Sequence, residues 1–345
     1  MLENTSLLYL LAFLAALGIS SLSVPYLKKI ASRYSILDHP VQSHKTHAEP
    51  IPYLGGIAIV MPIVLLTILG PIVVPISQEI WTRAILLVIP GLILSVVGLV
   101  DDMKNVSALP RFIIQSSVAT VISLLLIESN YSVSITTNNY LNFLFSILWI
   151  VGITNAMNFI DNLDGGAAGI TLFSSFTIFL LAIHGNQHLI AAFSLTISGA
   201  SLGFLYWNRN PASIYLGDSG ALFIGLLLSV LLLQFEPTAS SLVSSAAIPI
   251  LVLAIPIIDT AVVVISRLLR GVSIFQGGRD HLSHRLIASG RSRKEAAVIL
   301  WSLSGFFSLL SIVSEFMEYG RDLISASGLV LMVSLVFLFL RKPHL

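Results

Sequence analysis

Residues 155–166 read Asn-Ala-Met-Asn-Phe-Ile-Asp-Asn-Leu-Asp-Gly-Gly and directly follow an apolar run from Leu141 to Ile153. This short stretch carries five carboxylate or amide side chains next to a segment of membrane type. Polar groups packed that densely are costly to bury beside apolar segments unless a partner satisfies them. We therefore expect a functional site here, with a ligand that is a cation, a nucleotide or both.

The composition of the whole chain indicates an integral membrane protein. Of its 345 residues, 56% are hydrophobic and only 10% are charged, and the mean hydropathy is +0.93. One soluble core cannot bury so much apolar surface. The chain contains no cysteine, which excludes a disulfide framework and thiolate metal sites.

Apolar runs close to the ~20 residues that cross a bilayer predict an all-α, polytopic membrane fold with about eleven transmembrane helices. Four of the prolines inside these runs, Pro62, Pro71, Pro90 and Pro256, are expected kink sites. We detect no internal repeat and no separate soluble domain, so residues 1–345 are read as one membrane-embedded domain. The expected spans are Leu7–Leu27, Tyr53–Ile76, Ala84–Val100, Phe112–Ile127, Leu141–Ala156, Ala167–Ile183, Leu189–Tyr206, Ala221–Phe235, Leu242–Ile265, Ala296–Phe316 and Leu323–Leu340.

The basic residues predict the orientation. If the N-terminus is outside and the C-terminus cytoplasmic, all of the 18 Lys and Arg residues except Arg83 and Arg321 fall on the cytoplasmic side, as the positive-inside rule requires. The first apolar run, Leu7–Val24, has no basic segment before it and is followed by Lys28 and Lys29. This charge order favours a retained first span over a cleaved signal peptide.

With this topology, the unusual polar stretches all fall on the cytoplasmic side. Five separate clusters on one face suggest a single composite site. The clusters are Asp38–Pro52, Asp101–Arg111, Asn155–Gly166, Asn208–Gly220 and Arg267–Lys294.

Two carboxylates, Asp101 and Asp102, stand next to each other at the end of a span. Adjacent carboxylates repel, so at least one should have a raised pKa unless a cation lies nearby. Arg111 could supply that charge or bind a phosphate. The alternative is that the pair only solvates a helix end.

Asp218 lies in the run Gly217-Asp218-Ser219-Gly220, which opens another apolar segment. Glycines allow close backbone approach to a ligand, and a carboxylate is a hard oxygen ligand suited to magnesium. Asp before an apolar run is also a preferred helix N-cap. Both interpretations stay open, and they are compatible.

The last cytoplasmic loop contains Arg279-Asp-His-Leu-Ser-His-Arg285. If this run is helical, His281 and His284 share a face and could donate to phosphate oxygens. Zinc binding is the alternative, but no thiolate supports it and the surrounding charge is positive. We favour anion binding.

Two further polar features are less specific. The Pro-rich stretch with Lys45 and His47 leads into Gly55-Gly56 and is typical of a phosphate-contacting loop, although a plain polar linker looks similar. Asp259 lies within an apolar run, where an ionisable group is a functional candidate or pairs with a neighbour such as Arg267.

Taken together, the motifs resemble those of the polyprenyl-phosphate N-acetylhexosamine-1-phosphate transferases of glycosyltransferase family 4. The resemblance runs from Asp38 to Leu286 and is strongest to the bacterial undecaprenyl-phosphate N-acetylglucosaminyl-1-phosphate transferase branch. Each motif is weak, but their order is specific. They are Asp38-x-Pro with His44-Lys45-x-His47 and Leu54-Gly55-Gly56; Asp101-Asp102; Asn155-x-x-Asn158-x-x-Asp161-x-x-Asp164-Gly165; Gly217-Asp218-Ser219-Gly220; and Asp280-His281-x-x-His284-Arg285.

The resemblance implies an enzyme that transfers a sugar-1-phosphate, most simply GlcNAc-1-phosphate, from a UDP-N-acetylhexosamine to undecaprenyl phosphate, releasing UMP. It implies a Mg²⁺ cofactor, with Mn²⁺ as an alternative, and a bacterial inner membrane location with the active site on the cytoplasmic face. Nucleic acid is not an expected partner, and a homodimer is left open. The implied site residues are Asp101, Asp102 and Asp161 as the catalytic acidic centre; Asn158 and Asp218 as metal ligands; Asp164 at the uracil; and Lys45, His47, Asn105, Arg111, Asn155, His281, His284 and Arg285 as further substrate contacts.

Two departures from the family pattern limit these assignments. Ser283 stands where many relatives have a third His, which weakens a fixed catalytic His triplet, and Gly166 replaces a commoner Leu, which loosens the uridine assignment. The alternatives are a phospho-N-acetylmuramoyl-pentapeptide transferase, against which the run from Asp280 to Arg285 argues, and an ion-coupled transporter. A transporter predicts acids near the membrane midplane, whereas here only Asp259 lies deep.

Overall fold

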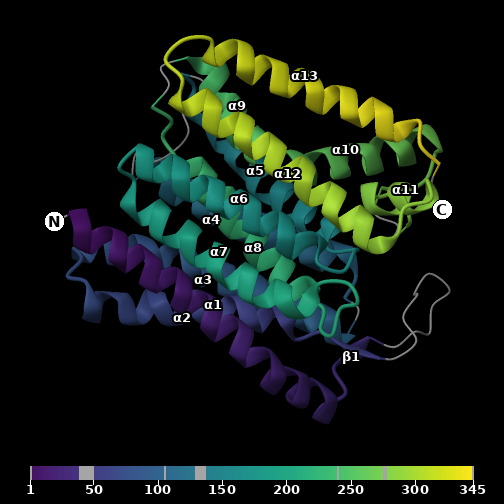
Figure 1. Cartoon of the computed structure of the whole chain (residues 1–345), viewed down its shortest axis with the longest axis horizontal. Coiled ribbons are helices and arrows are strands. Elements are labelled where there is room, and N and C mark those ends of the chain that lie inside the picture. The colour runs from purple at the N-terminus through teal and green to yellow at the C-terminus, as the bar shows by residue number, and fades with distance from the viewer. Residues whose placement is uncertain are drawn as a thin grey trace.

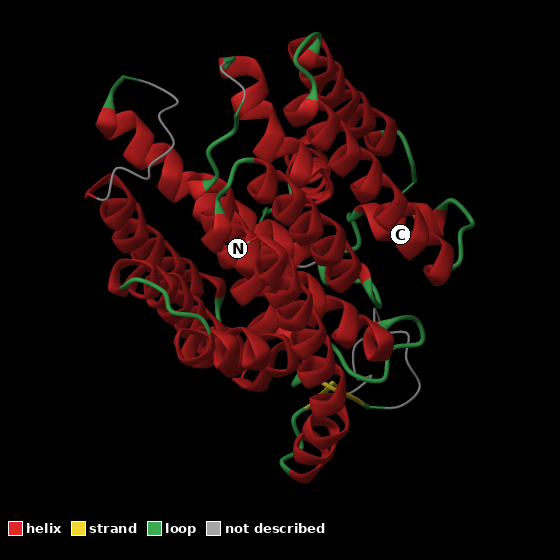
Figure 2. Cartoon of the chain, turned by 60° about the vertical axis from the view of Figure 1, so that its left-hand side comes forward, coloured by secondary structure: helices red, strands yellow, loops and turns green. Residues whose placement is uncertain are grey.

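Helices form nearly all of the regular structure in the computed structural model, which describes residues 2–38, 50–104, 106–128, 137–238, 241–274 and 278–343 (Figure 2). A two-residue antiparallel hairpin of β1 (Leu37–Asp38) and β2 (Ile51–Pro52) is the sheet in this part of the chain. The helices are α1 (Leu2–Arg33), α2 (Gly55–Val73), α3 (Gln78–Lys104), α4 (Ala108–Glu128), α5 (Asn139–Ile160), α6 (Gly166–His184), α7 (His188–Asn208), α8 (Gly217–Gln234), α9 (Leu242–Val252), α10 (Ala254–Leu269), α11 (Leu282–Ala288), α12 (Arg293–Phe316) and α13 (Arg321–Leu340).

The predicted all-α polytopic membrane fold is confirmed. Among the described residues, 10 helices are long and apolar enough to cross a membrane, and the bent pair α9 and α10 raises this to 11. Every predicted apolar run lies within or largely overlaps one of these helices. Several helices extend past the apolar run at one end, which places polar residues such as Asp101 and Asn158 on the last helical turns instead of in loops.

The helices run roughly side by side, with the two termini at opposite ends of the bundle (Figure 1). Successive helices alternate in direction, so one end of the bundle gathers the end of α3, the start of α4, the end of α5 and the start of α8. The other end carries different polar contacts, such as that between the Thr238 N–H and Glu315. The described residues of all five predicted polar clusters therefore lie at one end, while the side of the membrane that it faces stays a prediction.

Helix α8 occupies the centre of the bundle, and nearly all of its side chains are buried (Figure 1). It packs against α3 and α5 along its length. Glycines let neighbouring helices approach its first turn: a Cβ at Gly98 of α3 would lie 2.4 Å from the Asp218 carbonyl carbon, and one at Gly56 of α2 would lie 2.3 Å from the Gly220 nitrogen. This close packing positions Asp218 relative to α2 and α3.

The predicted span Leu242–Ile265 is not one helix. It breaks at Leu253 into α9 and α10, which are bent by 79°. Pro256 has no N–H to donate to the Val252 carbonyl, and its ring would clash with that carbonyl in a continuous helix. The freed carbonyl instead accepts the Ser174 hydroxyl of α6 at 2.8 Å. The kink expected at Pro256 is thus a full break a short distance before it.

Candidate active site

A carboxylate cluster forms where the ends of α3, α4, α5 and α8 meet. Arg111, in the first turn of α4, donates through Nη1 to Asp218 Oδ2 at 2.6 Å and also pairs with Asp101. Asn158, near the end of α5, donates from Nδ2 to Asp218 Oδ1 at 2.7 Å. The structure thus brings together four residues that the sequence assigned from separate motifs. We call Asp101, Asp102, Asp161 and Asp218 the acidic cluster.

Both oxygens of Asp101 are held by the protein. The Val106 N–H donates to Oδ1 at 2.6 Å, and the Arg111 guanidinium takes Oδ2. The side chain is buried at the interface of α3 and α4. Arg111 is therefore the nearby cation that the adjacent carboxylates Asp101 and Asp102 were expected to need.

Asp102 satisfies the free N–H groups at the start of α8. Its Oδ1 accepts the Asp218 N–H at 2.9 Å and its Oδ2 accepts the Ser219 N–H at 3.2 Å. Gly217 makes this approach feasible because it adopts a φ of +72°, and a Cβ there would lie 2.6 Å from Asp102 Oδ2. Asp218 itself is not the N-cap, since Leu216 holds that position. A carboxylate from α3 thus caps α8 and leaves the Asp218 side chain free for the cluster.

Asp161 follows the last turn of α5 and faces the same cluster. Loss of hydration, together with the carboxylates of Asp218 and Asp102, raises its pKa well above the ordinary value, although the Gly217 N–H opposes the rise. A carboxyl that is poorly hydrated and surrounded by other acids is stabilised by any cation that enters. Asp161 is thus the member of the cluster that most lacks positive charge.

Asp164 connects the turn between α5 and α6 to the loop after α7. Its Oδ2 accepts from Asn210 Nδ2 at 2.7 Å and from the Ala212 N–H at 3.1 Å. Gly165, with a φ of +73°, donates its N–H to Asn208 Oδ1 at 3.0 Å. These two donors engage one Asp164 oxygen and leave the other for a ligand, and the predicted contact of Asp164 with a uracil stays a prediction.

Asn155 points toward α4 and is partly exposed. Its Nδ2 donates to Gln115 Oε1 at 2.6 Å and to the Val151 carbonyl at 2.8 Å. The predicted substrate contact of Asn155 would therefore use its amide oxygen, since its nitrogen already has two protein acceptors. Gln115 was not singled out from the sequence, although an amide inside an expected span is a signal of a polar partner.

The second group of site residues lies in residues 278–285, which we call the histidine loop. Asp280 accepts from Arg267 Nε at 3.1 Å and also pairs with Arg270. His281 Nδ1 lies 2.8 Å from Asp259 Oδ2. The expected pairing of Asp259 with Arg267 is therefore wrong, because Arg267 is directed to Asp280 while Asp259 faces the His281 ring.

Arg285, a predicted phosphate contact, is directed into the protein. Its guanidinium is 1% exposed. It donates from Nε to the Asp280 carbonyl at 2.9 Å, from Nη1 to the carbonyls of Phe339 and Lys342 at 3.0 and 2.9 Å, and from Nη2 to Ser266 at 2.8 Å. A guanidinium has five donors, and four of them are used here. Arg285 therefore ties the histidine loop to the end of α13, and its predicted phosphate contact stays a prediction.

His281 and His284 are close, but they do not share a helical face. His281 is the extended residue before α11, and His284 lies within it; the ring centroids are 6.1 Å apart. Burial, and then the neighbouring basic groups His281, Arg279 and Arg293, lower the pKa of His284 to about 4. His284 is consequently neutral at pH 7, so any phosphate contact it makes is that of a neutral donor.

Three predicted substrate contacts, Lys45, His47 and Asn105, lie outside the described residues.

Two residues that the sequence did not single out organise the site from outside the motifs. Asn208 links the turn between α5 and α6 to the loop after α7: its Oδ1 accepts the Gly165 N–H, and its Nδ2 donates to the Ile214 carbonyl at 2.9 Å. Trp301 of α12 donates from Nε1 to the Gly165 carbonyl at 3.0 Å. Neither residue lies in a motif with a recognisable spacing.

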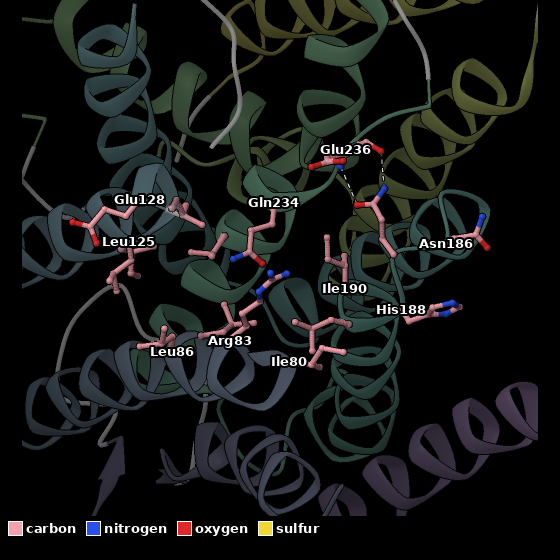
Figure 3. A pocket seen from close by; sticks show the side chains of 16 residues that line it. Ile80, Arg83, Leu86, Leu125, Glu128, Asn186, His188, Ile190, Gln234 and Glu236 are labelled. Carbon is pink, nitrogen blue, oxygen red and sulfur yellow. Dashed lines mark hydrogen bonds between the residues drawn. The ribbon is translucent and has the colours of Figure 1, made fainter. Parts of the chain in front are cut away.

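A pocket of about 560 Å³ lies at the opposite end of the bundle, between α3, α4, α7 and α8 (Figure 3). Leu86, Leu125 and Ile190 line it, with Arg83 and Gln234 at its polar side. Near it, Gln187 Nε2 donates to the Glu236 carbonyl at 2.6 Å. Because these are the ends of the helices remote from the acidic cluster, this pocket is separate from the candidate active site.

The geometry of the acidic cluster, with acids and one arginine at four helix ends of a membrane bundle, agrees with comparisons to known proteins. The model of the family described as "Glycosyl transferase family 4" matches residues 84–236. This range runs from within α3 through α8 to just beyond it and includes the whole acidic cluster and Arg111. Together with a relative that is 34% identical over 91% of this chain, described next, the match shows that the chain belongs to this family. It is a multi-pass membrane phosphoglycosyltransferase, which confirms the predicted resemblance and excludes the transporter alternative.

Individual relatives narrow the comparison. A "Probable undecaprenyl-phosphate N-acetylglucosaminyl 1-phosphate transferase" of Bacillus subtilis is 34% identical over 318 residues, which covers 91% of this chain and 87% of the relative. A "Decaprenyl-phosphate N-acetylglucosaminephosphotransferase" of Mycolicibacterium smegmatis is 27% identical over 94% of this chain and 87% of its own length. A "Phospho-N-acetylmuramoyl-pentapeptide-transferase" of Halalkalibacterium halodurans is 27% identical over 91% and 99%.

Proposed function

We propose that this protein transfers N-acetylglucosamine-1-phosphate from UDP-GlcNAc to undecaprenyl phosphate, releases UMP, and so starts a lipid-linked glycan of the cell envelope. The observation that carries the proposal is the joining of Asp101, Arg111, Asn158 and Asp218 at one end of the bundle. The names of the relatives with 34% and 27% identity support this sugar.

The reaction makes and breaks one phosphorus–oxygen bond. An oxygen of the acceptor phosphate bonds to the phosphorus that carries the sugar, the bond from this phosphorus to the bridging oxygen breaks, and UMP leaves with the electron pair. Because both reactants are anions, neutralisation of charge and alignment dominate the barrier. Arg111, held between Asp101 and Asp218 by its guanidinium, is the described basic group closest to these acids.

The residues present fit a divalent cation. Carboxylate and amide oxygens are the ligands that Mg²⁺ takes in proteins, and Asp218, Asn158 and Asp161 would supply them. Asn158 now directs its nitrogen to Asp218, and an amide flip would present the oxygen instead. Among the described residues, no three or more His, Cys, Asp or Glu side chains converge as a metal centre. A bound magnesium would therefore take further ligands from substrate phosphates, and it would supply charge neutralisation at the diphosphate.

We assign Asp101 to positioning and not to general base catalysis. A phosphate monoester has a second pKa of about 6, so the acceptor is already largely ionised at neutral pH and proton removal contributes little. Both Asp101 oxygens are also engaged, by the Val106 N–H and by Arg111. Asp101 therefore orients Arg111 toward the reacting phosphates.

The location of the site explains the use of a membrane acceptor. The acidic cluster lies at the ends of membrane helices, so a lipid phosphate can reach it while its prenyl chain stays in the bilayer. We propose that this end faces the cytoplasm of a bacterial inner membrane, because the predicted topology places all Lys and Arg residues except Arg83 and Arg321 there. UDP-GlcNAc would then approach from the aqueous side.

The proposal is tested with purified protein in detergent, Mg²⁺, undecaprenyl phosphate and radiolabelled UDP-GlcNAc. We expect a lipid-linked GlcNAc diphosphate and one UMP per sugar transferred. A parallel reaction with UDP-MurNAc-pentapeptide tests the alternative that the relative from Halalkalibacterium halodurans represents. Product from the pentapeptide donor alone would move the assignment to the peptidoglycan branch, and no product from either donor would refute the proposal.

A further inference from the structure

Asp259 is an acid that the transfer chemistry described above does not use. It lies on α10, past the break at Leu253, and its side chain is 0% exposed. A carboxylate in such an apolar position is costly unless specific partners satisfy it. Its partners therefore show why it is there.

Each Asp259 oxygen has one partner in the histidine loop. Oδ2 lies 2.8 Å from His281 Nδ1, and Oδ1 accepts the Leu282 N–H at 2.7 Å. Leu282 is the first residue of α11, and the preceding residue, His281, provides no side-chain cap. Asp259 thus replaces the missing cap from another helix. An ionised carboxylate only accepts hydrogen bonds, so a neutral His281 ring that pairs with an ionised Asp259 would carry its proton on Nδ1.

The His281 ring also packs against the end of α5, the helix that carries Asn158. The ring lies 5.8 Å from the Phe159 ring at 72°, and Phe159 follows the predicted metal ligand Asn158. Ser283 donates to Asn162 Oδ1, and Asn162 Nδ2 donates to the Phe159 carbonyl at 2.5 Å. These contacts dock the histidine loop on the end of α5. With Nδ1 committed to Asp259, Nε2 is the ring nitrogen left for a ligand at that end.

Other charged groups near the ring are already engaged or are basic. Asp280, the neighbour in sequence, is taken by Arg267 and Arg270. His284 faces the ring from α11, and Arg279 and Arg293 lie near His284. Asp259 is thus the described acid that contacts the His281 side chain.

We propose that Asp259 is a positioning residue for His281: it holds Nδ1 and the start of α11, and so presents Nε2 to the diphosphate of the sugar nucleotide. The identity of that ligand rests on the proposed function, whereas the hydrogen bond and the protonation of Nδ1 do not. Partners of this kind fix the ring orientation and the tautomer of a functional histidine.

The first test observes the ring directly. Protein labelled with ¹⁵N-histidine is studied by NMR in detergent at pH 8, with His281→Gln used to assign the signal. We expect the neutral His281 ring to be protonated on Nδ1. Asp259→Asn keeps an oxygen for the Leu282 N–H but places an NH₂ group opposite Nδ1, so the proton should move to Nε2. A wild-type ring protonated on Nε2 would overturn the proposal, whatever the activity.

The second test is a double-mutant cycle on transfer from UDP-GlcNAc. Asp259→Asn should lower kcat/KM by about 10–100-fold, the usual effect of removing such a partner. If Asp259 acts through His281, adding Asp259→Asn to His281→Ala should cause no further loss beyond about twofold. A full additional loss in the double variant would mean that Asp259 only supports the fold, and it would refute the positioning role.

A matched control is Glu315→Gln. Glu315 is another buried acid that accepts a backbone N–H, from Thr238 at 2.7 Å, but it lies at the opposite end of the bundle. We expect it to leave kcat/KM and the His281 tautomer unchanged. If wild-type protein shows no transfer at all, the proposed function fails while the NMR result still decides the role of Asp259.

Discussion

In the acidic cluster, four carboxylates share one described arginine, Arg111, whereas in the histidine loop two carboxylates, Asp259 and Asp280, face two arginines and a histidine. The first region has an excess of negative charge that no described side chain compensates, and the pKa of Asp161 is raised there. In the second region Asp280 pairs with Arg267 and Arg270, and both Asp259 oxygens have hydrogen-bond partners in the histidine loop. The difference fits the proposed function, in which the acidic cluster binds a divalent cation and the histidine loop is held in place by the protein itself.

The largest effect should come from Asp218→Asn. It removes the carboxylate that Arg111 and Asn158 both contact, and with it a proposed magnesium ligand. We expect turnover to fall by about 10³-fold, comparable with the loss of a main electrostatic contact. The measurement is Mg²⁺-dependent transfer from radiolabelled UDP-GlcNAc, together with a thermal unfolding curve in detergent. Turnover within threefold of wild type would show that the cluster is not the catalytic centre.

Arg111→Ala should separate charge balance from catalysis within the acidic cluster. Transfer should fall by about 10²-fold because the phosphates lose a guanidinium. At the same time Asp101 and Asp218 lose their shared cation, so Mn²⁺, followed by its paramagnetic signal, should bind more tightly than in wild type. Weaker Mn²⁺ binding in the variant would contradict the view that Arg111 and a metal ion compete for the same carboxylates.

In the histidine loop, Arg285→Met should damage stability more than substrate binding. The variant removes the guanidinium donors from the Lys342 carbonyl and from the Phe339 carbonyl, which keeps a backbone donor from Lys342. A buried polar group left unsatisfied costs about 1–3 kcal/mol. We expect a clear fall in Tm and a KM for UDP-GlcNAc within about twofold of wild type, because the guanidinium makes no substrate contact. A large rise in KM with an unchanged Tm would restore the phosphate contact that the sequence suggested.

The smallest effect concerns His284 and pH. Its pKa is about 4 in the folded protein and near 6.5 when unfolded, so the unfolded chain binds more protons between these values. Stability should therefore rise with pH across this window and be lost as the pH falls from 6.5 toward 4. His284→Gln should flatten the dependence of Tm on pH between pH 7 and 5, and a slope equal to that of wild type would contradict this. Near pH 8 the His284 ring is neutral in both the folded and the unfolded chain, so the Tm difference between wild type and His284→Gln should no longer change with pH.

The sequence predicted the membrane helices well because each depends on local hydropathy. It also located the polar clusters, since Asp101, Asn158 and Asp218 are conspicuous beside apolar runs. It could not predict which partners they choose. Arg285 looks like a phosphate ligand in a basic loop, and its true acceptors lie at the end of α13, more than 50 residues away. Pairings set by tertiary packing leave no periodic signal along the chain.

The same limit applies to the backbone. The break at Leu253 depends on Pro256 and on the Ser174 hydroxyl of α6. No sequence pattern near Leu253 indicates that Ser174 would bond there. Asp102 was grouped with Asp101 as an acid of the centre, but its contacts with the Asp218 and Ser219 N–H groups depend on the left-handed conformation of Gly217. The roles of single residues within the acidic cluster stay predictions, to be decided by the variants above.

The grip of Arg285 on the Phe339 and Lys342 carbonyls has a consequence for biosynthesis. A ribosome makes the acidic cluster and the histidine loop well before it makes the end of α13. The loop therefore lacks its last anchor until synthesis has passed residue 342, and a chain released earlier would carry every predicted catalytic residue without a locked site. Synthesis through residue 342 would then act as a checkpoint on the activity of the nascent enzyme.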